Sequence, residues 1–185
     1  MIEKFKVNLE KYSLQHEVDS NEWVIPSSVI VLIYSKNNTY NILLNKRTYS
    51  VKDHKGEISF PGGRQNKNDN SLLTTALREF EEEMGVPQTK IDIIGRLSNV
   101  ITSTNYSITP YLATTSSHLD FSPNPKEVAL LIEIPINELK KPENLRSEIH
   151  VSNNTFQKYI CYSYEGNYIW GATARILTEL LYIYD

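Results

Sequence analysis

The chain of 185 residues contains a single cysteine, Cys161. A lone cysteine excludes an internal disulfide and a zinc site built from several cysteines. Because Cys161 stands in a tyrosine-rich stretch, KYICYSY, we interpret it as a small apolar side chain of a strand rather than as a nucleophile.

Long hydrophobic runs and an excess of positive charge are also missing. No apolar run reaches the roughly 18 residues of a membrane span, and the first residues, MIEKFKVNLE, lack the apolar core of a signal peptide. Lys and Arg number 19 against 22 Asp and Glu, which gives a net charge of −3. This balance gives no support to a general nucleic-acid or membrane-surface role. We therefore expect a cytoplasmic protein without a nucleic-acid or membrane partner.

The apolar content, 40%, is sufficient for the core of one domain. Strand-like segments occupy residues 27–35 and 40–47, which form a predicted hairpin over Val29–Arg47, and then 57–60, 90–100, 107–116 and 127–135. A late hairpin is predicted at 155–164 and 167–171. Helices are predicted at 4–15, with Phe5, Leu9 and Leu14 on the buried side, at Ser71–Met84, as a turn at 136–141, and at 172–184. This order indicates an α+β fold with a mixed sheet between helices.

The helix at Ser71–Met84 contains the most informative stretch, ALREFEEEMG, at residues 76–85. Asp69, Asn70 and Ser71 are all suitable N-caps, and Gly85 followed by Pro87 is a helix stop. Glu79, Glu82 and Glu83 stand at positions i, i+3 and i+4, so the sequence predicts that they project from one side, roughly opposite the apolar side chains of Leu73, Leu77, Phe80 and Met84.

Three crowded carboxylates repel one another, and the C-terminal end of a helix disfavours negative charge further. A solvated charged face is the ordinary explanation of such a run. A divalent cation is the alternative, because carboxylate oxygens suit Mg²⁺ or Mn²⁺. Arg78 can hold a carboxylate bidentately, and the nearby Pro61-Gly62-Gly63 can add a backbone carbonyl to a metal shell. The combination favours a metal site.

The segment GGRQNKNDNSLLTTALREFEEEMGV, residues 62–86, resembles the Nudix box, G-x5-E-x7-R-E-U-x-E-E-x-G-U with U apolar. Gly63 matches the leading glycine, and residues 78–86 match the second half in full. The middle differs, because Asp69 replaces the glutamate and eight residues rather than seven separate it from Arg78.

A second stretch, LLNKRTYSVKDHKGEISFPGG at residues 43–63, resembles the additional motif of the Nudix coenzyme A pyrophosphatases, L-L-T-x-R-S-x3-R-x3-G-x3-F-P-G-G. Asn45, Thr48 and Lys52 replace its threonine, serine and second arginine. The longer box spacing and the stretches TALRE, NPKEV and IWGATARIL are also similar to that group, so the resemblance extends from about Val29 to Leu177.

The resemblance implies one Nudix domain over residues 1–185, with its box at about 63–86, folded as an α/β/α sandwich. It implies a pyrophosphohydrolase, an acid anhydride hydrolase that uses Mg²⁺ or Mn²⁺. Glu82 and Glu83 are the firmest implied metal ligands, with Glu79 and the Gly63 carbonyl. Glu79 is alternatively the group that orients the attacking water. Arg78 is implied to clamp the carboxylates.

The remaining site residues lie outside the acidic helix. Glu127 in NPKEV is our candidate for the general base, and an ordinary exposed acid at a strand end is an equal alternative. Arg47 and Lys52 offer positive charge to substrate phosphates, and Gly62 and Gly63 allow the backbone to approach metal and phosphate closely.

The expected reaction is hydrolysis of coenzyme A or its thioesters to 3′,5′-ADP and (acyl-)4′-phosphopantetheine. One alternative is another nucleoside diphosphate derivative, such as ADP-ribose, NADH, a dinucleoside polyphosphate or a nucleoside triphosphate. A non-catalytic nucleotide-binding domain is a second alternative. The expected partner is this small nucleotide, and a monomer and a homodimer are both compatible with the sequence.

Overall fold

A computed structural model describes residues 5, 8–9, 23–50, 54–152 and 155–184 of the chain. Lys52, Leu14 and most of the helix predicted at 4–15 lie outside these residues. Phe5 and Leu9 are described, and both are buried as predicted.

The centre of the molecule is a mixed sheet of eight strands. Strands β1 (Ile25–Lys36) and β2 (Thr39–Arg47) form the predicted hairpin, and Asn37 and Asn38 turn the chain with φ of +53° and +59°. Asparagine tolerates this left-handed conformation better than most residues. Strand β1 also runs parallel to β7 (Tyr106–Thr114), which makes the sheet mixed.

Five further strands complete this sheet. Strand β3 (Ile58–Ser59) lies beyond β2, β5 (Asp92–Arg96) lies beyond β7, and β8 (Val128–Pro135) also pairs with β2. The short strands β4 (Gly62–Arg64) and β6 (Val100–Ile101) pair with β1 and β7. The strand predicted at 90–100 is therefore divided between a 3₁₀ turn, η1 (Gln88–Lys90), β5 and β6. Strand β4 has no counterpart in the predicted elements.

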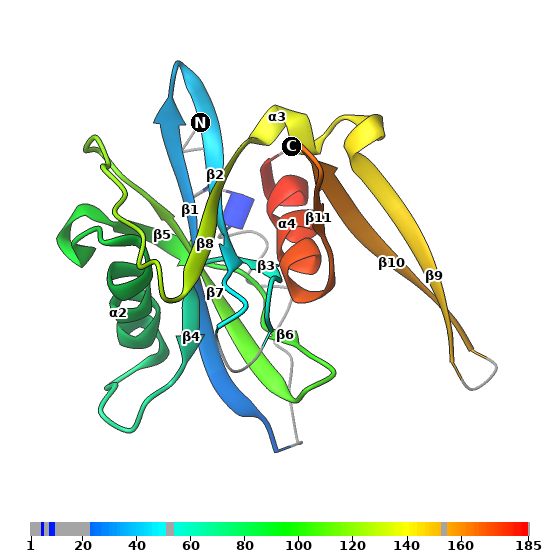
Figure 1. Ribbon diagram of the computed structural model, residues 1–185, viewed down its shortest axis with the longest axis horizontal. Helices are drawn as coiled ribbons and strands as arrows, with labels where there is room; N and C mark the ends of the chain where they lie inside the picture. Colours follow the sequence, from blue (N-terminus) through cyan, green and yellow to red (C-terminus); the bar gives the residue numbers. More distant parts are fainter. Residues whose placement is uncertain (1–4, 6–7, 10–22, 51–53, 153–154, 185) are drawn as a thin grey trace.

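The two faces of the sheet are covered by different helices, as Figure 1 shows. Because side chains alternate along a strand, β1 and β2 contribute to both faces. Ile30, Leu32 and Leu43 pack with α2 (Leu72–Met84). Val31, Ile33, Ile42 and Leu44 pack in the cluster that contains α4 (Gly171–Tyr184). The predicted mixed sheet between helices is thus confirmed. None of the helices in the described part of the chain is long and apolar enough to span a membrane.

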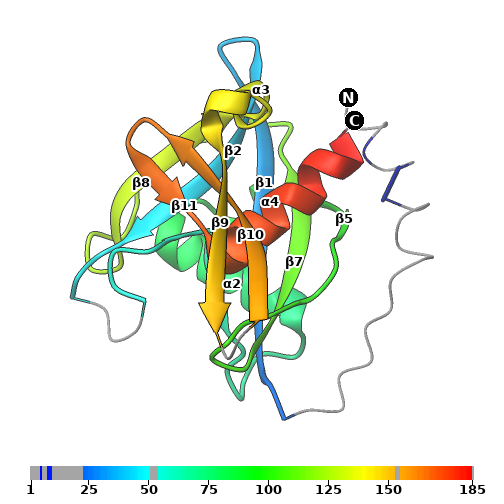
Figure 2. The same ribbon diagram turned by 90° about the vertical axis from the view of Figure 1, so that its right-hand side faces the viewer.

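A separate three-stranded sheet follows α3 (Ile136–Leu139) and the 3₁₀ turn η2 (Pro142–Asn144). Strands β10 (Thr155–Tyr164) and β11 (Asn167–Ile169) form the predicted late hairpin, and β9 (Leu145–Ser152), which the sequence did not predict, pairs with β10. This sheet lies beside α4 (Figure 2), and the Tyr162 hydroxyl lies 3.0 Å from Thr178 Oγ1 of that helix.

Candidate active site

The acidic helix α2 begins and ends as its sequence predicts. Ser71 is the N-cap, since its hydroxyl accepts a hydrogen bond from the Thr74 amide at 3.1 Å, and Gly85 closes the helix in the left-handed conformation. The three carboxylates do not share one exposed face. Glu82 is 54% exposed and Glu79 is 18% exposed, whereas Glu83 is only 2% exposed. Their spacing keeps them on one side of the helix, but Glu83 lies at the edge of that side that faces the sheet.

The sheet surrounds Glu83 with hydrogen-bond donors. Asn45 Nδ2 on β2 and the Gly62 amide on β4 both donate to Glu83 Oε2 at 3.1 Å. Arg47 Nη1 lies 3.6 Å from the other oxygen, Oε1. Burial nevertheless raises the pKa of Glu83 to about 8, because the Gly62 amide and the Arg47 charge offset only part of the desolvation. The protein thus holds a buried carboxylate that lacks full compensation by positive charge.

Arg78 links the other acids, and its principal partner is Asp69. Its Nε and Nη2 donate to the two Asp69 oxygens at 3.0 and 2.9 Å, while Nη1 lies 2.9 Å from Glu79 and 3.0 Å from Glu82. The hydrogen bond from Arg78 lowers the pKa of Asp69, and Asp69 in turn raises the pKa of Arg78. The predicted bidentate clamp is present. Asp69 is shorter than the usual glutamate and is separated from Arg78 by eight residues rather than seven. Its carboxylate nevertheless contacts this arginine.

Two glycines on β4 allow the backbone to pass closely beneath these acids. A Cβ on Gly62, whose φ is +150°, would lie 2.2 Å from the Ser28 carbonyl oxygen of β1. A Cβ on Gly63 would lie 2.7 Å from the carboxyl carbon of Glu79. Gly62 therefore allows this strand to pair closely with β1, and Gly63 leaves room for the Glu79 carboxylate in its present position.

Two more predicted residues approach the same acids. The negative charge of Glu127 contributes to raising the pKa of both Glu79 and Glu83, for which burial is the main cause, so Glu127 is electrostatically coupled to both. Its side chain accepts a hydrogen bond from Asn124 Nδ2 at 3.1 Å. Arg47 ends β2 at this site, and its Nε is buried without a hydrogen-bond partner among the described residues. The structure brings together every predicted site residue that it describes.

Sequence reasoning missed two residues that support Glu83. Asn45 is 1% exposed, and its Oδ1 accepts a hydrogen bond from Ser59 Oγ at 2.9 Å. The available signal was Asn45 itself, a polar residue at the position of the motif threonine, within the apolar run of Leu43 and Leu44. No feature of the sequence around Ser59 indicated that it supports this site.

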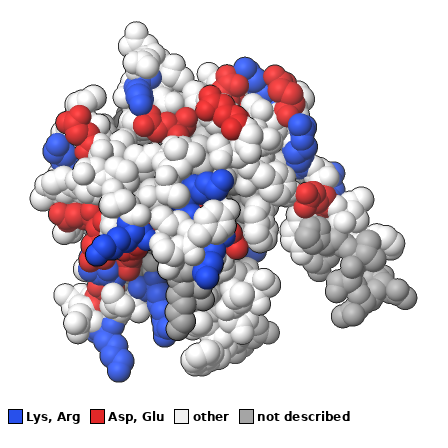
Figure 3. Space-filling model, viewed as in Figure 1, with Lys and Arg blue, Asp and Glu red and all other residues white. Residues whose placement is uncertain are grey.

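A divalent cation fits the donors present. Within the described residues, no three acidic, histidine or cysteine side chains are already arranged as metal ligands, and Arg78 contacts Glu79 and Glu82. However, Glu83 and Glu79 are both carboxylates whose pKa burial raises, and a cation would supply the missing positive charge. Glu79 lies against the backbone of Gly63. Figure 3 shows acidic and basic side chains gathered together over α2.

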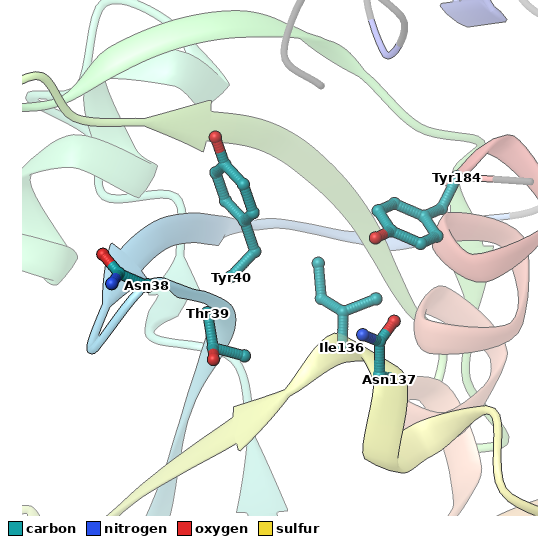
Figure 4. A pocket seen from close by; sticks show the side chains of 6 residues that line it. All are labelled: Asn38, Thr39, Tyr40, Ile136, Asn137 and Tyr184. Atoms are coloured by element: carbon teal, nitrogen blue, oxygen red, sulfur yellow. The ribbon is translucent and has the colours of Figure 1, made fainter.

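A pocket of about 290 Å³ lies elsewhere, between the β1–β2 turn, α3 and the end of α4 (Figure 4). No predicted site residue lines it. Its lining consists of Asn38, Thr39, Tyr40, Ile136, Asn137 and Tyr184.

Comparison with known proteins identifies the family. The NUDIX domain model matches residues 24–151. A relative from Yersinia pestis (strain Pestoides F), named "Uncharacterized Nudix hydrolase NudL", is 36% identical over 140 residues, which cover 75% of this chain and 70% of the relative.

Solved structures show the same fold. A MutT/nudix family protein from Enterococcus faecalis has a TM-score of 0.56 at 15% identity, covering 97% of this chain and 69% of that one. The NUDIX domain of Shewanella oneidensis NrtR, crystallised with ADP ribose, has a TM-score of 0.50 at 20% identity, covering 72% and 87%. The chain therefore belongs to the Nudix family and is a Nudix hydrolase, a pyrophosphohydrolase that acts on a pyrophosphate substrate.

Proposed function

We propose that this Nudix hydrolase cleaves the diphosphate of coenzyme A or its thioesters, giving 3′,5′-ADP and (acyl-)4′-phosphopantetheine. One observation supports this substrate class above others. Three residues of the stretch that resembles the coenzyme A pyrophosphatase motif lie around Glu83. Arg47 and Gly62, which match the motif, and Asn45, which stands at the position of its threonine, supply the three contacts described above for that carboxylate.

Nudix hydrolases generally use divalent metal cations, and we propose Mg²⁺ or Mn²⁺ here. The residues that would hold the cation are Glu79, Glu82, Glu83 and the Gly63 carbonyl. When bound, it would neutralise charge on the phosphates and lower the pKa of a water molecule. Arg78 keeps Glu79 and Glu82 in place through its anchor on Asp69.

We assign proton transfer to Glu127. It is coupled to Glu79 and Glu83, so in its charged form it can accept the proton that the attacking water loses. Arg47 has an unused buried donor and carries a fixed positive charge. We assign it to the substrate phosphates, together with Lys52, which follows on the same stretch.

A substrate screen tests the proposal. Coenzyme A, acetyl-coenzyme A, dephospho-coenzyme A, ADP-ribose, NADH and diadenosine compounds should be compared with Mg²⁺ and Mn²⁺, with products identified by mass. We expect the highest kcat/KM for coenzyme A or its thioester, with 3′,5′-ADP as product. Faster cleavage of ADP-ribose or a dinucleotide would refute the substrate assignment. An inactive protein at all metal concentrations would instead favour a nucleotide-binding domain.

Matched variants locate the activity. Glu83→Gln should abolish turnover, because a neutral amide is a poor ligand for a hard cation. Glu81→Gln is the control, since Glu81 is a half-buried neighbour on the same helix whose carboxylate contacts Gln88 and none of the predicted site residues described above. Equal loss in both variants would argue against the assigned site.

A further inference from the structure

Asn45 is a buried polar residue in the buried run of strand β2. It stands on β2 directly after Leu43 and Leu44, which are fully buried, and is itself 1% exposed. A buried side-chain amide is costly unless its polar atoms are hydrogen-bonded. Here its nitrogen donates to Glu83 and its oxygen accepts from Ser59. Both polar atoms of the Asn45 side chain are therefore hydrogen-bonded.

The sheet register produces this arrangement. Asn45 and Ser59 are direct partners across the antiparallel β2–β3 pair, so their side chains lie on the same face. The Ser59 hydroxyl donates to Asn45 Oδ1 at 2.9 Å, which leaves Nδ2 directed at Glu83. If the amide were reversed, its oxygen would face the carboxylate, and two acceptors would repel each other.

The consequence for Glu83 is that its two oxygens differ. Oε2 accepts two hydrogen bonds, from Asn45 and from the Gly62 amide. Oε1 has Arg47 at 3.6 Å, beyond a normal hydrogen bond. The carboxylate is thus fixed through Oε2, whereas Oε1 receives neither of these two hydrogen bonds and has the Arg47 charge as its partner among the described residues.

We propose that Asn45, oriented by Ser59, is a positioning residue that fixes Glu83 so that Oε1 is presented to the catalytic cation. This inference rests on the proposed metal-binding role of Glu83 and is independent of which diphosphate is cleaved. It also gives a reason for the departure at this position, where Asn45 replaces the motif threonine: the amide reaches Ser59 and Glu83 together.

Mn²⁺ binding to the full chain tests the proposal without a substrate. The free Mn²⁺ signal in electron paramagnetic resonance reports the dissociation constant directly. Removal of a residue that orients a metal ligand typically weakens metal affinity by about 10- to 100-fold, so we expect a loss of that size in Asn45→Leu. At saturating Mn²⁺, kcat should fall while the substrate KM remains unchanged, because Asn45 touches the ligand and not the substrate.

Asn41→Leu is the matched control. Asn41 is a buried asparagine on the same strand, four residues earlier and hence on the same face, but it contacts the carbonyls of Lys36 and Thr39. Its variant should bind Mn²⁺ as the wild type does. Asn45→Thr should recover part of the lost affinity, because its hydroxyl can still donate to Glu83.

Ser59→Ala extends the test along the chain of hydrogen bonds. It should weaken Mn²⁺ binding less than Asn45→Leu does, and the double variant should be no weaker than Asn45→Leu, because Ser59 acts through Asn45. If Asn45→Leu does not fold, Asn45→Thr and Ser59→Ala should each still show a measurable loss.

Wild-type Mn²⁺ affinity in folded Asn45→Leu, or an equal loss in Asn41→Leu, would overturn the proposal. If the variants show the predicted Mn²⁺ affinities but no substrate in the screen is cleaved, only the proposed reaction is refuted.

Discussion

Glu83 is the residue whose chemistry depends most on its surroundings. Its ordinary pKa is 4.5, and burial raises the value in the folded protein to about 8. Between these two pH values, the metal-free folded protein binds a proton that the unfolded chain releases. Its free energy of unfolding must therefore decrease as pH rises through this window, by at most about 1.4 kcal/mol per pH unit. Above the folded pKa, no further decrease comes from this group.

Urea unfolding of metal-free wild type and Glu83→Gln between pH 5 and 8 tests this pH dependence. The wild type should lose stability relative to the variant as pH rises, because glutamine does not titrate. Glu81→Gln should follow the wild type. Added Mn²⁺ should stabilise the wild type more at pH 8 than at pH 5, since the cation binds the charged carboxylate. Parallel pH curves for wild type and Glu83→Gln would contradict this explanation.

Individual residues differ in how far the sequence could identify them. Arg78 and the three glutamates stand at motif positions, so a pattern was enough to select them. The contacts of Asn45 with Ser59 could not be predicted, because they depend on the β2–β3 register, and Ser59 is 14 residues away along the chain. The partnership of Asp69 with Arg78 depends on a loop conformation that the irregular spacing did not reveal.

At the scale of elements, the short strand β4 connects the fold to the site. It has only three residues, Gly62–Arg64, and pairs with β1 while lying beneath α2. Its two glycines have different neighbours. Gly62 lies against the backbone of β1, which cannot move without breaking the sheet, whereas Gly63 lies against the end of the Glu79 side chain.

Alanine at these two positions should therefore have different effects. Gly62→Ala should lower the free energy of unfolding by on the order of 3 kcal/mol, because of its positive φ and its overlap with the Ser28 carbonyl. Gly63→Ala should change stability by no more than about 1 kcal/mol but lower kcat/KM by about 10-fold or more, because it displaces Glu79. Chemical denaturation and steady-state kinetics measure both. Equal stability losses in the two variants would show that this distinction is wrong.

The same element shows why some secondary structure could not be predicted. The hairpin of β1 and β2 has strong hydrophobic patterns, and α2 and α4 have helical periodicity with clear starts or ends, so all four were predicted. Strand β4 contains two glycines, and β9 reads LRSEIHVS, which is largely polar. Both become strands because a neighbouring strand supplies hydrogen-bond partners, and this information is not local.

At the scale of the whole molecule, the two sheets share one core. Tyr162 and Ile169 from the three-stranded sheet, Leu177 from α4 and Leu44 from the main sheet belong to a single cluster of buried side chains. Burial of apolar surface is the dominant favourable term in folding. Since neither sheet can leave this cluster without exposing the other, we expect residues 1–185 to behave as one cooperative domain.

Native-state hydrogen exchange of the backbone amides tests this cooperativity. Strand β1 represents the main sheet and β10 the three-stranded sheet, and each is hydrogen-bonded to neighbouring strands. In low concentrations of urea, the slowest amides of both strands should exchange with the same opening free energy and the same dependence on urea, because both open only when the whole domain unfolds. A lower opening free energy in β10 than in β1 would mean that the three-stranded sheet unfolds independently. The shared cluster would then contribute too little to couple the two sheets, and the chain would contain two units.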